Sequence, residues 1–331
     1  MSDSVTDVPA RLRPRTATII YNPLAGPSEL MQTLHEAAGI WRARGWRVNE
    51  QSTQYAGHAR QLARAAARQG EHLVFAAGGD GTLGEVADGL VDSETILAPL
   101  PAGTGNSLAK ELHMPRPSLL NPNHLLEAAA SLAAGVVHRI DVGLCDQGHH
   151  WLLWASVGVD SYLVDNMEPR SKLVKRLGPF GYVGQALLAA PGYTQTRIRV
   201  TVDDRTIEDD FLMATICNCR RYAGGELLLN PGGKLDDGQF EVWLFRGQGL
   251  TTMLSMVMQI RTGQHLLNPA IQMLTGKQVR VETEQVLAFH TDGDPAGKSP
   301  FQCQIKPAAL RLLVPDTAPL GLFQHAGEPL I

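Results

Sequence analysis

The sequence predicts two domains: an α/β domain with a parallel sheet and helices on both faces, followed by a mainly antiparallel β-sandwich domain. Up to about residue 136, short apolar runs alternate with longer amphipathic stretches, which is typical of a parallel sheet with crossover helices. Beyond that point, short strand-like runs follow one another between turn residues, which is typical of a sandwich. The length of 331 residues also favours two domains over one.

The elements follow from these patterns in chain order. We expect a flexible start at 1–15, the α/β domain at 16–136, the sandwich at 137–315 and a tail at 316–331 that packs on the first domain. The first domain is predicted to hold strands at 16–21, 46–48, 73–77 and 96–100, and helices at 29–44, capped by Ser28, and at 57–69. The second is predicted to hold strands at 139–144, 151–159, 196–202, 211–218, 240–245, 278–282 and 310–314, and helices at 170–190 and 251–261.

Composition narrows the class of protein. Hydrophobic residues make up 44% of the chain and charged residues 19%, which is enough to bury a sizeable core. The formal net charge of −4 argues against nucleic acid as the main partner. It does not exclude a membrane surface, because a local basic patch can dock an acidic protein.

The cysteines and the N-terminus favour a cytoplasmic protein. Of the four cysteines, only Cys217 and Cys219 are close in sequence, and a lone C-x-C pair is a poor zinc pattern, so we expect buried, reduced thiols. The first fifteen residues are polar and lack the apolar core of a signal peptide. No apolar run reaches the length of a membrane span.

Two glycine-rich loops are the most informative motifs. Gly78-Gly79-Asp80-Gly81-Thr82 and Pro101-Ala102-Gly103-Thr104-Gly105-Asn106 each follow a buried-strand pattern and precede a helix. This arrangement presents backbone N–H groups to an anion, and glycine permits both the turn and the close approach of a phosphate. Two such loops in one domain predict one polyphosphate held from two sides.

Three other interpretations of these glycines are weaker. Residues 78–82 could be an ordinary tight turn, but such turns rarely need three glycines around an acid. Gly79-x-Gly81-x-x-Gly84 matches the dinucleotide fingerprint, which alone is a weak signal. Residues 293–299 resemble a Walker A loop but are one residue short and precede no long helix, so we interpret them as a hairpin or loop.

Acidic residues at strand boundaries are the second group of candidates. Asp80 would repel a bare phosphate, so we expect it to face a Mg²⁺ ion that the nucleotide carries. Asp236-Asp237-Gly238 and Asp292-Gly293-Asp294 could be plain acidic turns. Carboxylates at strand ends also suit a divalent ion or a proton acceptor.

A basic stretch suggests contact with a membrane. Residues 170–176 carry four positive charges among apolar residues, and Phe180 and Tyr182 follow closely. Such a stretch is either a solvated helix face or a contact with an anionic bilayer.

The ordered set of motifs resembles the diacylglycerol kinase catalytic family, specifically the soluble bacterial lipid kinases, which are related to sphingosine and ceramide kinases. The resemblance covers about residues 16–315. In chain order, the motifs that carry it are Asn22-Pro23-x-x-Gly26, Thr53 with Gly57-His58-Ala59, Gly78 to Thr82, Pro101 to Asn106, Asp141-Val142-Gly143, Gly158-x-Asp160, Asn218 with Gly224-Gly225, Pro231 with Asp236-Asp237-Gly238, and Asp292-Gly293-Asp294.

The resemblance implies an active site in the cleft between the two domains. Its ATP site would comprise Asn22, Pro23, Gly26, Thr53, Gly78, Gly79, Asp80, Gly81, Thr82, Glu85, Gly103, Thr104, Gly105 and Asn106. It also implies a structural Mg²⁺ ion on the Asp237 carboxylate, helped by the carbonyls of Lys234 and Gln239.

The family's general base is a glutamate in an Asp-Gly-Glu motif, and this chain has Asp294 at that position. Aspartate is one methylene shorter, which removes roughly 1.5 Å of reach. A proton acceptor must come within about 3 Å of the hydroxyl that it serves. Either the backbone or the substrate pose therefore shifts, or the rate is reduced, or the chain is not an active kinase. We expect activity to be retained, since a carboxylate is kept.

These expectations combine into an ATP- and Mg²⁺-dependent lipid kinase. Asp294 would take the proton of a diacylglycerol-like hydroxyl, Asp292 would orient it, and Asp80 would stand near the metal. We expect a cytoplasmic protein that contacts the inner face of the membrane peripherally and binds no nucleic acid. A kinase of a soluble acceptor such as NAD, or a catalytically weak lipid-binding regulator on the same scaffold, are the alternatives. The sequence leaves the lipid, the activators and the oligomeric state open.

Overall fold

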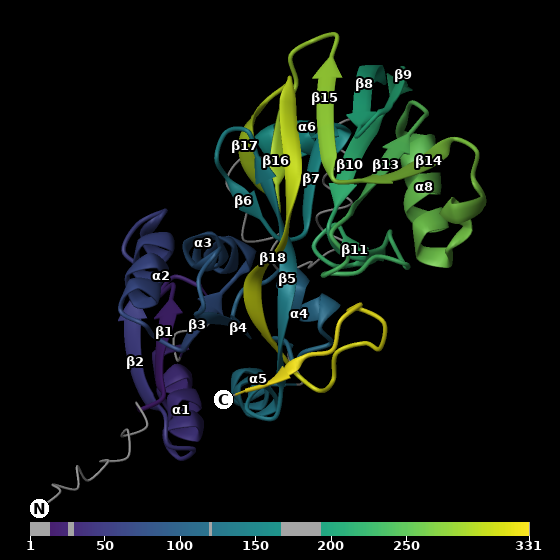
Figure 1. Ribbon diagram of the computed structural model, residues 1–331. Helices are drawn as coiled ribbons and strands as arrows, with labels where there is room; N and C mark the ends of the chain where they lie inside the picture. The colour runs from purple at the N-terminus through teal and green to yellow at the C-terminus, as the bar shows by residue number, and fades with distance from the viewer. Residues whose placement is uncertain (1–13, 26–29, 119–120, 167–192, 331) are drawn as a thin grey trace, which may run out of the picture.

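The computed structural model describes residues 14–25, 30–118, 121–166 and 193–330. It confirms the predicted fold class: an α/β domain with a parallel sheet, joined to an antiparallel β-sandwich (Figure 1). The predicted residues Gly26 and Ser28 and the predicted 170–190 helix, with Phe180 and Tyr182, lie outside the described residues.

The α/β domain is built on four parallel strands in the order β2-β1-β3-β4. They are β1 (Thr16–Tyr21), β2 (Arg47–Ser52), β3 (Leu73–Gly78) and β4 (Ile96–Pro101). Helices α1 (Leu30–Arg42) and α5 (His124–Leu132) contact each other on one face, and α2 (His58–Arg68) and α3 (Asp80–Leu90) on the other (Figure 1). Every residue of β3 and β4 is buried, as expected for strands covered on both faces.

Two long strands join the domains. β5 (Val136–Cys145) and β18 (Phe301–Val314) pair antiparallel along most of their length, and β18 also pairs with β4 in parallel. The register of β18 shifts between Lys306 and Leu310, and Asp141 of β5 accepts a hydrogen bond from Ala308 N at 2.8 Å within this bulge. The parallel sheet therefore continues through β18 into the sandwich.

The sandwich packs two antiparallel layers. Beyond β18, the shared sheet adds β15 (Gln278–Thr283), β8 (Thr196–Val202) and β9 (Arg205–Phe211). The facing sheet has the order β14 (Ile271–Gly276), β13 (Phe240–Phe245), β10 (Met213–Cys217), β7 (Trp154–Gly158), β16 (Ala288–Thr291) and β17 (Asp294–Lys298). Large side chains such as Phe240, Phe289 and Phe301 fill the space between the layers.

The remaining elements surround this frame. They are α4 (Ser107–Glu111), β6 (His150–Trp151), α6 (Val159–Asn166), β11 (Arg221–Tyr222), β12 (Leu227–Leu228), α8 (Leu250–Thr262), the 3₁₀ helix η1 (Gln264–Leu267) and β19 (Glu328–Pro329). The hairpin of β11 and β12 lies between α4 and α8 (Figure 1). Among the described residues, no helix is long and apolar enough to cross a membrane.

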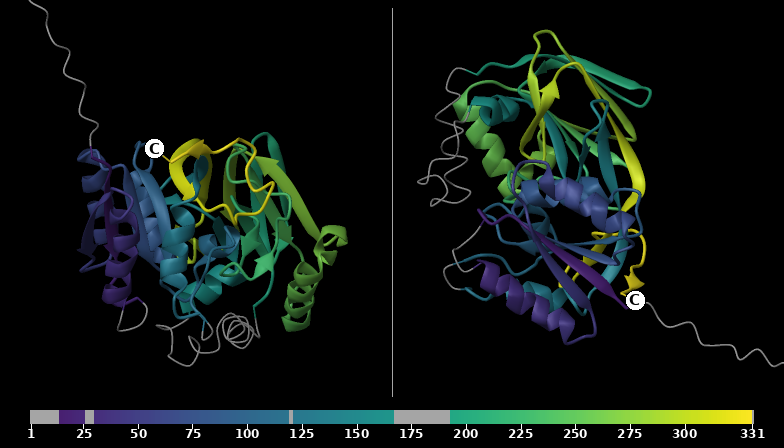
Figure 2. Two further views of the ribbon diagram at one scale, coloured as in Figure 1. Left: turned by 90° about the horizontal axis from the view of Figure 1, so that it is seen from below. Right: turned by 90° about the vertical axis from the view of Figure 1, so that its left-hand side faces the viewer.

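The C-terminal tail runs back along the joining strands. β19 pairs with the start of β5, and Asp236 accepts hydrogen bonds from the backbone N–H groups of Gln324 and His325. Leu322 is fully buried in the core of the α/β domain. The end of the tail, drawn in yellow, therefore lies against the α/β domain, near α5 (Figures 1 and 2).

Several details differ from the sequence-based expectations. Helix α1 ends at Arg42 rather than at 44, β2 extends to Ser52, and β18 begins nine residues before the predicted 310–314 strand. β9 was not expected, because its exposed face is polar and its sequence shows little apolar alternation. All four cysteines are buried and free, as predicted.

Candidate active site

The first glycine loop forms the first turn of α3. Gly79 immediately precedes the helix, so Asp80, Gly81 and Thr82 occupy the turn whose N–H groups have no partner within a helix. Such a helix N-terminus attracts an anion. A side chain at Gly78 would collide with Thr82, because its Cβ would lie 2.6 Å from the Thr82 Cβ.

The second glycine loop packs directly on the first. The backbone N–H groups of Ala102 and Gly103 donate to the Gly78 carbonyl at 3.0 and 3.1 Å, and a Cβ on Gly103 would overlap the backbone of Gly79. The glycines of both loops have negative φ, so an unusual turn conformation is not the reason for glycine here. Glycine is required because the two loops approach each other closely. The left-handed residue is Asn106, with φ of 54°, whose side chain bonds both backbone groups of Gly103.

Asp80 ties the two loops together. Its carboxylate accepts hydrogen bonds from Ser107 N at 2.6 Å and from Ser107 Oγ at 3.3 Å, at the start of α4. Burial raises the pKa of Asp80, and the Ser107 hydrogen bonds and the Lys110 charge oppose that rise. The acid that seemed to require a metal ion therefore already has a structural partner, and a role toward Mg²⁺ stays a prediction.

The other predicted ATP-site residues of this domain gather at the carboxyl ends of the parallel strands. Asn22 follows β1 and bonds the Ala77 carbonyl at the end of β3, and Thr53 N bonds the Tyr21 carbonyl. Glu85 reaches across from α3 and accepts Gly57 N at 2.7 Å and Ala59 N at 3.0 Å, at the start of α2. Ligands bind at this edge in open α/β sheets.

A tight hairpin from the sandwich faces these loops. Asp292 and Gly293 join β16 to β17 with φ of 52° and 91°, the conformation of a type I′ turn, which Asp-Gly favours. The Asp292 carboxylate accepts three backbone N–H groups, from Leu152 at 2.7 Å, Leu153 at 2.8 Å and Trp154 at 3.1 Å. Burial raises the pKa of Asp292 to about 6, against these donors and with the help of the Asp80 charge.

Asp294 completes the facing pair. It is exposed at the start of β17, and a Cβ built on Gly81 would lie 3.5 Å from Asp294 Oδ2. The structure thus brings Asp80 of α3 to one place with Asp292 and Asp294 of the β16–β17 hairpin, from two distant segments of the chain. Asp292 orients Asp294 by fixing the turn, because its own carboxylate is directed at the backbone of residues 152–154.

A buried chain of polar contacts links α4 to this hairpin, and sequence reasoning did not predict most of it. Lys110 Nζ donates to the Gly224 carbonyl at 2.5 Å, and Glu111 accepts Arg220 Nε at 3.0 Å and Arg221 N at 2.9 Å. The sequence shows Lys110 and Glu111 only as ordinary charges on a short helix, and their burial could not be predicted from it.

The same chain continues through the sandwich to β16. Tyr222 Oη donates to Asp160 at the start of α6, and His290 Nε2 lies 3.2 Å from the same carboxylate. Although burial opposes it, the hydrogen bond and charge of His290 lower the pKa of Asp160. His290 precedes the Asp292 turn by two residues, so the hairpin is anchored on both sides.

The predicted Mg²⁺ residues form a separate acidic cluster beside the β18 bulge. Asp237 Oδ1 accepts Gln239 N at 3.1 Å, and Asp141 accepts Gly238 N at 2.6 Å. Burial and neighbouring carboxylates raise the pKa of Asp141, Asp237 and Glu241, the last to about 7. This excess of oxygen ligands and negative charge suits a divalent ion. No group of three His, Cys, Asp or Glu side chains is arranged for a metal in the described segments, so carbonyls such as those of Lys234 and Gln239 and water would supply most ligands.

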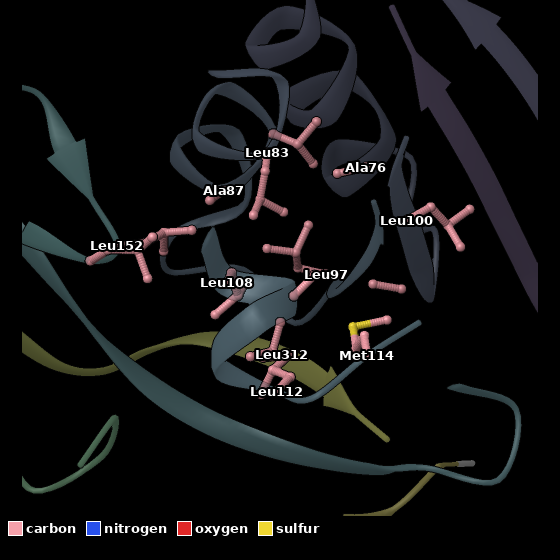
Figure 3. Packing of buried hydrophobic residues seen from close by; sticks show 14 of the residues in the cluster. Ala76, Leu83, Ala87, Leu97, Leu100, Leu108, Leu112, Met114, Leu152 and Leu312 are labelled. Carbon is pink, nitrogen blue, oxygen red and sulfur yellow. The ribbon is translucent and has the colours of Figure 1, made fainter. Parts of the chain in front are cut away.

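An apolar core supports the glycine loops from below. Leu83 and Ala87 of α3, Leu97 and Leu100 of β4, and Leu108 of α4 pack together there (Figure 3). Leu152 and Leu312 reach the same core from the joining region (Figure 3). The glycine loops therefore rest on the core of the α/β domain, whereas Phe289 of the facing hairpin packs in the separate core of the sandwich.

An anion cradle in an α/β domain, faced by a carboxylate from a β-sandwich, defines a two-domain kinase. Two family models match the chain: "Diacylglycerol kinase catalytic domain" at residues 16–145 and "YegS C-terminal NAD kinase beta sandwich-like domain" at 154–314. The chain belongs to the diacylglycerol kinase catalytic family and is a kinase enzyme, for which the family implies ATP as a substrate.

Curated relatives agree with this assignment, and a solved structure shares the fold. Diacylglycerol kinase of Bacillus subtilis strain 168 is 27% identical over 288 residues, covering 86% of this chain and 92% of the relative. Diacylglycerol kinase of Staphylococcus carnosus strain TM300 is 25% identical, covering 86% and 90%. A solved structure of a diacylglycerol kinase from Bacillus anthracis strain Sterne shares the fold, with a TM-score of 0.71, 20% identity, and 93% and 100% of the two chains covered.

Proposed function

We propose that this enzyme transfers the γ-phosphate of ATP to the hydroxyl of a diacylglycerol-like lipid with the help of Mg²⁺. The observation that carries the proposal is the approach of Asp294 to Gly81, which places a carboxylate from the sandwich beside the helix turn that would hold phosphate. The names of the relatives support diacylglycerol as the acceptor.

The glycine loops would hold the phosphates of ATP. The N–H groups of the first turn of α3 are available to phosphate oxygens, and the second loop closes the cradle from the other side. Asp80 holds the two loops in fixed relation through Ser107. Phosphoryl transfer depends mostly on positioning and charge stabilisation, so this rigidity is itself catalytic in effect.

Asp294 would accept the proton of the lipid hydroxyl. It is exposed toward the glycine loops, and the turn that carries it is fixed by Asp292. The hydroxyl oxygen would attack the terminal phosphorus as its proton passes to Asp294, and ADP would leave. Bound Mg²⁺ would offset the charge of the transferring phosphoryl group, and Asp237 with the carbonyls of Lys234 and Gln239 are the residues we assign to a structural ion.

Phosphoryl transfer from labelled ATP to a lipid panel tests the proposal. The purified protein is incubated with Mg²⁺ and with diacylglycerol, phosphatidylglycerol, a sphingoid base and, as a soluble acceptor, NAD. We expect label on diacylglycerol and none without Mg²⁺. Label on NAD alone would replace the lipid kinase with a soluble-acceptor kinase, and ATP binding without transfer to any acceptor would leave a regulatory protein on a kinase scaffold.

A further inference from the structure

An exposed apolar surface covers the outer side of α8 and η1. We define the α8 patch as Leu228, Leu254, Met258, Leu266, Leu267 and Met273. Leu267 is 87% exposed, Met258 59% and Leu266 53%. Nearly half of the large apolar side chains that are exposed in the described residues belong to this one region. Contiguous exposure of this kind marks an interaction site more often than scattered exposure does.

Helix α8 is apolar on two sides. Its inner side, with Met253, Met256 and Ile260, is buried in the same core as Trp243 of β13. Leu254 and Met258, one turn apart, point the other way and are exposed. A surface helix of a globular domain normally has one apolar face and a polar outer face. The outer face of α8 therefore carries two large apolar side chains among the exposed polar residues Thr251, Ser255, Arg261 and Thr262.

The charge of this region fits a phospholipid surface. Between Glu241 and Glu282 the sequence contains no Asp or Glu, in a chain that has 33 of them. Of the four cations in this stretch, Arg246 pairs with Asp209 and Arg280 with Glu282, while Arg261 lies in the last turn of α8 and Lys277 follows β14. A bilayer that contains anionic lipid would meet no repulsion here. A two-fold contact with a second copy would instead bring Arg261 of both copies together, and neither α8 nor η1 contributes an acid.

The patch is also continuous with the cleft. Leu228 belongs to β12, which contacts α8, and the paired strand β11 contacts α4. Helix α4 follows the second glycine loop and is tied to the β11–β12 hairpin by Lys110, which bonds its turn, and by Glu111, which bonds the start of β11. A surface that touches the patch is therefore one hairpin away from the phosphate cradle.

We propose that the α8 patch docks the enzyme on the phospholipid bilayer from which it takes its acceptor. This inference rests on the proposed lipid kinase function and assigns the surface that meets the membrane. Met258, Leu266 and Leu267 enter the interface between headgroups and acyl chains, with α8 lying along the membrane plane.

Vesicle binding by two matched variants tests this assignment. The patch variant is M258Q/L267Q, and the control is M31Q/L320Q, which makes the same changes at side chains 61% and 100% exposed on α1 and the tail. Each protein is co-sedimented with vesicles of phosphatidylcholine and phosphatidylglycerol. We expect the wild type and the control to bind alike and the patch variant to bind at least about tenfold more weakly, since buried apolar area sets such affinities. All three should unfold at the same temperature.

Two further measurements separate the possible failures. Transfer to a short-chain, water-soluble diacylglycerol should be equal in the three proteins, because this acceptor needs no docking. Vesicle binding that is absent in the wild type, or equal in the patch variant, would overturn the docking assignment and leave the kinase intact. A wild-type dimer that the patch variant dissolves, seen by sedimentation velocity, would assign the surface to a second copy instead. A selective loss of vesicle binding without transfer to any lipid would support docking and reject the kinase.

Discussion

At the residue scale, the carboxylates around the cleft are used largely to hold backbone in place. Asp80 fixes Ser107, Glu85 fixes the start of α2, and Asp292 fixes residues 152–154. Each contact joins segments that are far apart in sequence. Donors and acceptors held in advance need not reorganise during the reaction, which is how preorganised sites gain their effect.

Asp294 should behave as the proton acceptor under substitution. We expect Asp294→Asn to lower kcat by at least about a hundredfold, because the amide cannot accept the proton. Asp294→Glu should keep most of the activity, since it keeps the carboxylate and restores the side chain that the family resemblance implies. Steady-state transfer with ATP and diacylglycerol measures both. If Asp294→Asn has the kcat of the wild type and an unchanged affinity for ATP, Asp294 is not the proton acceptor.

Glu241 should make stability depend on pH. Its pKa is raised to about 7 by burial and by the Asp237 charge, above the ordinary 4.5. The stability that this group contributes is therefore present below about pH 4.5 and is lost as the pH rises through 7. As the pH rises from about 4.5 to 7, the free energy of unfolding of Glu241→Gln should increase by about 3 kcal/mol relative to that of the wild type. Urea unfolding across this range measures the difference.

Added Mg²⁺ provides a control for the same variant. A divalent ion on Asp237 would favour the charged form of Glu241 and shrink the gap between wild type and variant at pH 8. A gap that is flat with pH would contradict the raised pKa of Glu241. A difference in unfolding free energy that stays the same when Mg²⁺ is added would contradict the proposed ion site.

At the element scale, the short helix α4 connects the glycine loops to the sandwich. Its first residue, Ser107, is held by Asp80. Of its last residues, Lys110 is held by Gly224 in the β11–β12 turn and Glu111 by Arg220 and Arg221 at the start of β11. Tyr222 of the same hairpin reaches Asp160 and through it His290 of β16. The glycine loops and the turn that carries Asp294 are thus linked by a series of contacts.

Glu111→Gln should weaken both the fold and the reaction. The amide can accept from only one of Arg220 and Arg221, which leaves the other buried group unsatisfied, so we expect about 3 kcal/mol lower stability. We also expect kcat to fall more than KM for ATP rises, because the phosphate loops remain while their relation to Asp294 loosens. Glu127→Gln on the exposed side of α5 is the matched control, expected within about 0.5 kcal/mol of wild type. Equal stability and activity of the two variants would show that α4 does not couple the glycine loops to the sandwich.

The elements differ in how well the sequence predicted them, for physical reasons. Strands 16–21, 196–202 and 240–245 have the predicted bounds, because a buried apolar run or a clear alternation ends at turn residues. The glycine loops were predicted to form one anion cradle, and the structure packs them together. The partners of Asp80 and Asp292 could not be predicted, because no local pattern records a hydrogen bond to a backbone group dozens of residues away. β18 was predicted short because Pro307 interrupts its pattern at the bulge.

At the scale of the whole molecule, the two domains share one sheet. β18 pairs with β4 of the first domain at one end and with β15 of the sandwich at the other. The tail then pairs with β5 and places Leu322 in the core of the first domain. Relative motion of the domains must therefore bend β5 and β18, and the bulge held by Asp141 is the place where such bending costs least.

The tail should contribute measurably to stability. Leu322 is fully buried and Leu320, two residues earlier, is fully exposed. We expect Leu322→Ala to lower the free energy of unfolding by about 2–4 kcal/mol through the cavity that it leaves, and Leu320→Ala to change it by less than about 0.5 kcal/mol. Urea unfolding of the two variants measures both. Similar values for the pair would mean that the tail does not pack on the core as described.

The position of β18 in the chain has a consequence for how the protein is made. The edge of β4 is completed by a strand at 301–314, so during synthesis the first domain emerges from the ribosome with an apolar sheet edge unpaired until most of the chain has been translated. Open edges of this kind attract other chains. The nascent protein should therefore depend on chaperones, and a copy truncated before Phe301 should aggregate rather than accumulate as a folded first domain.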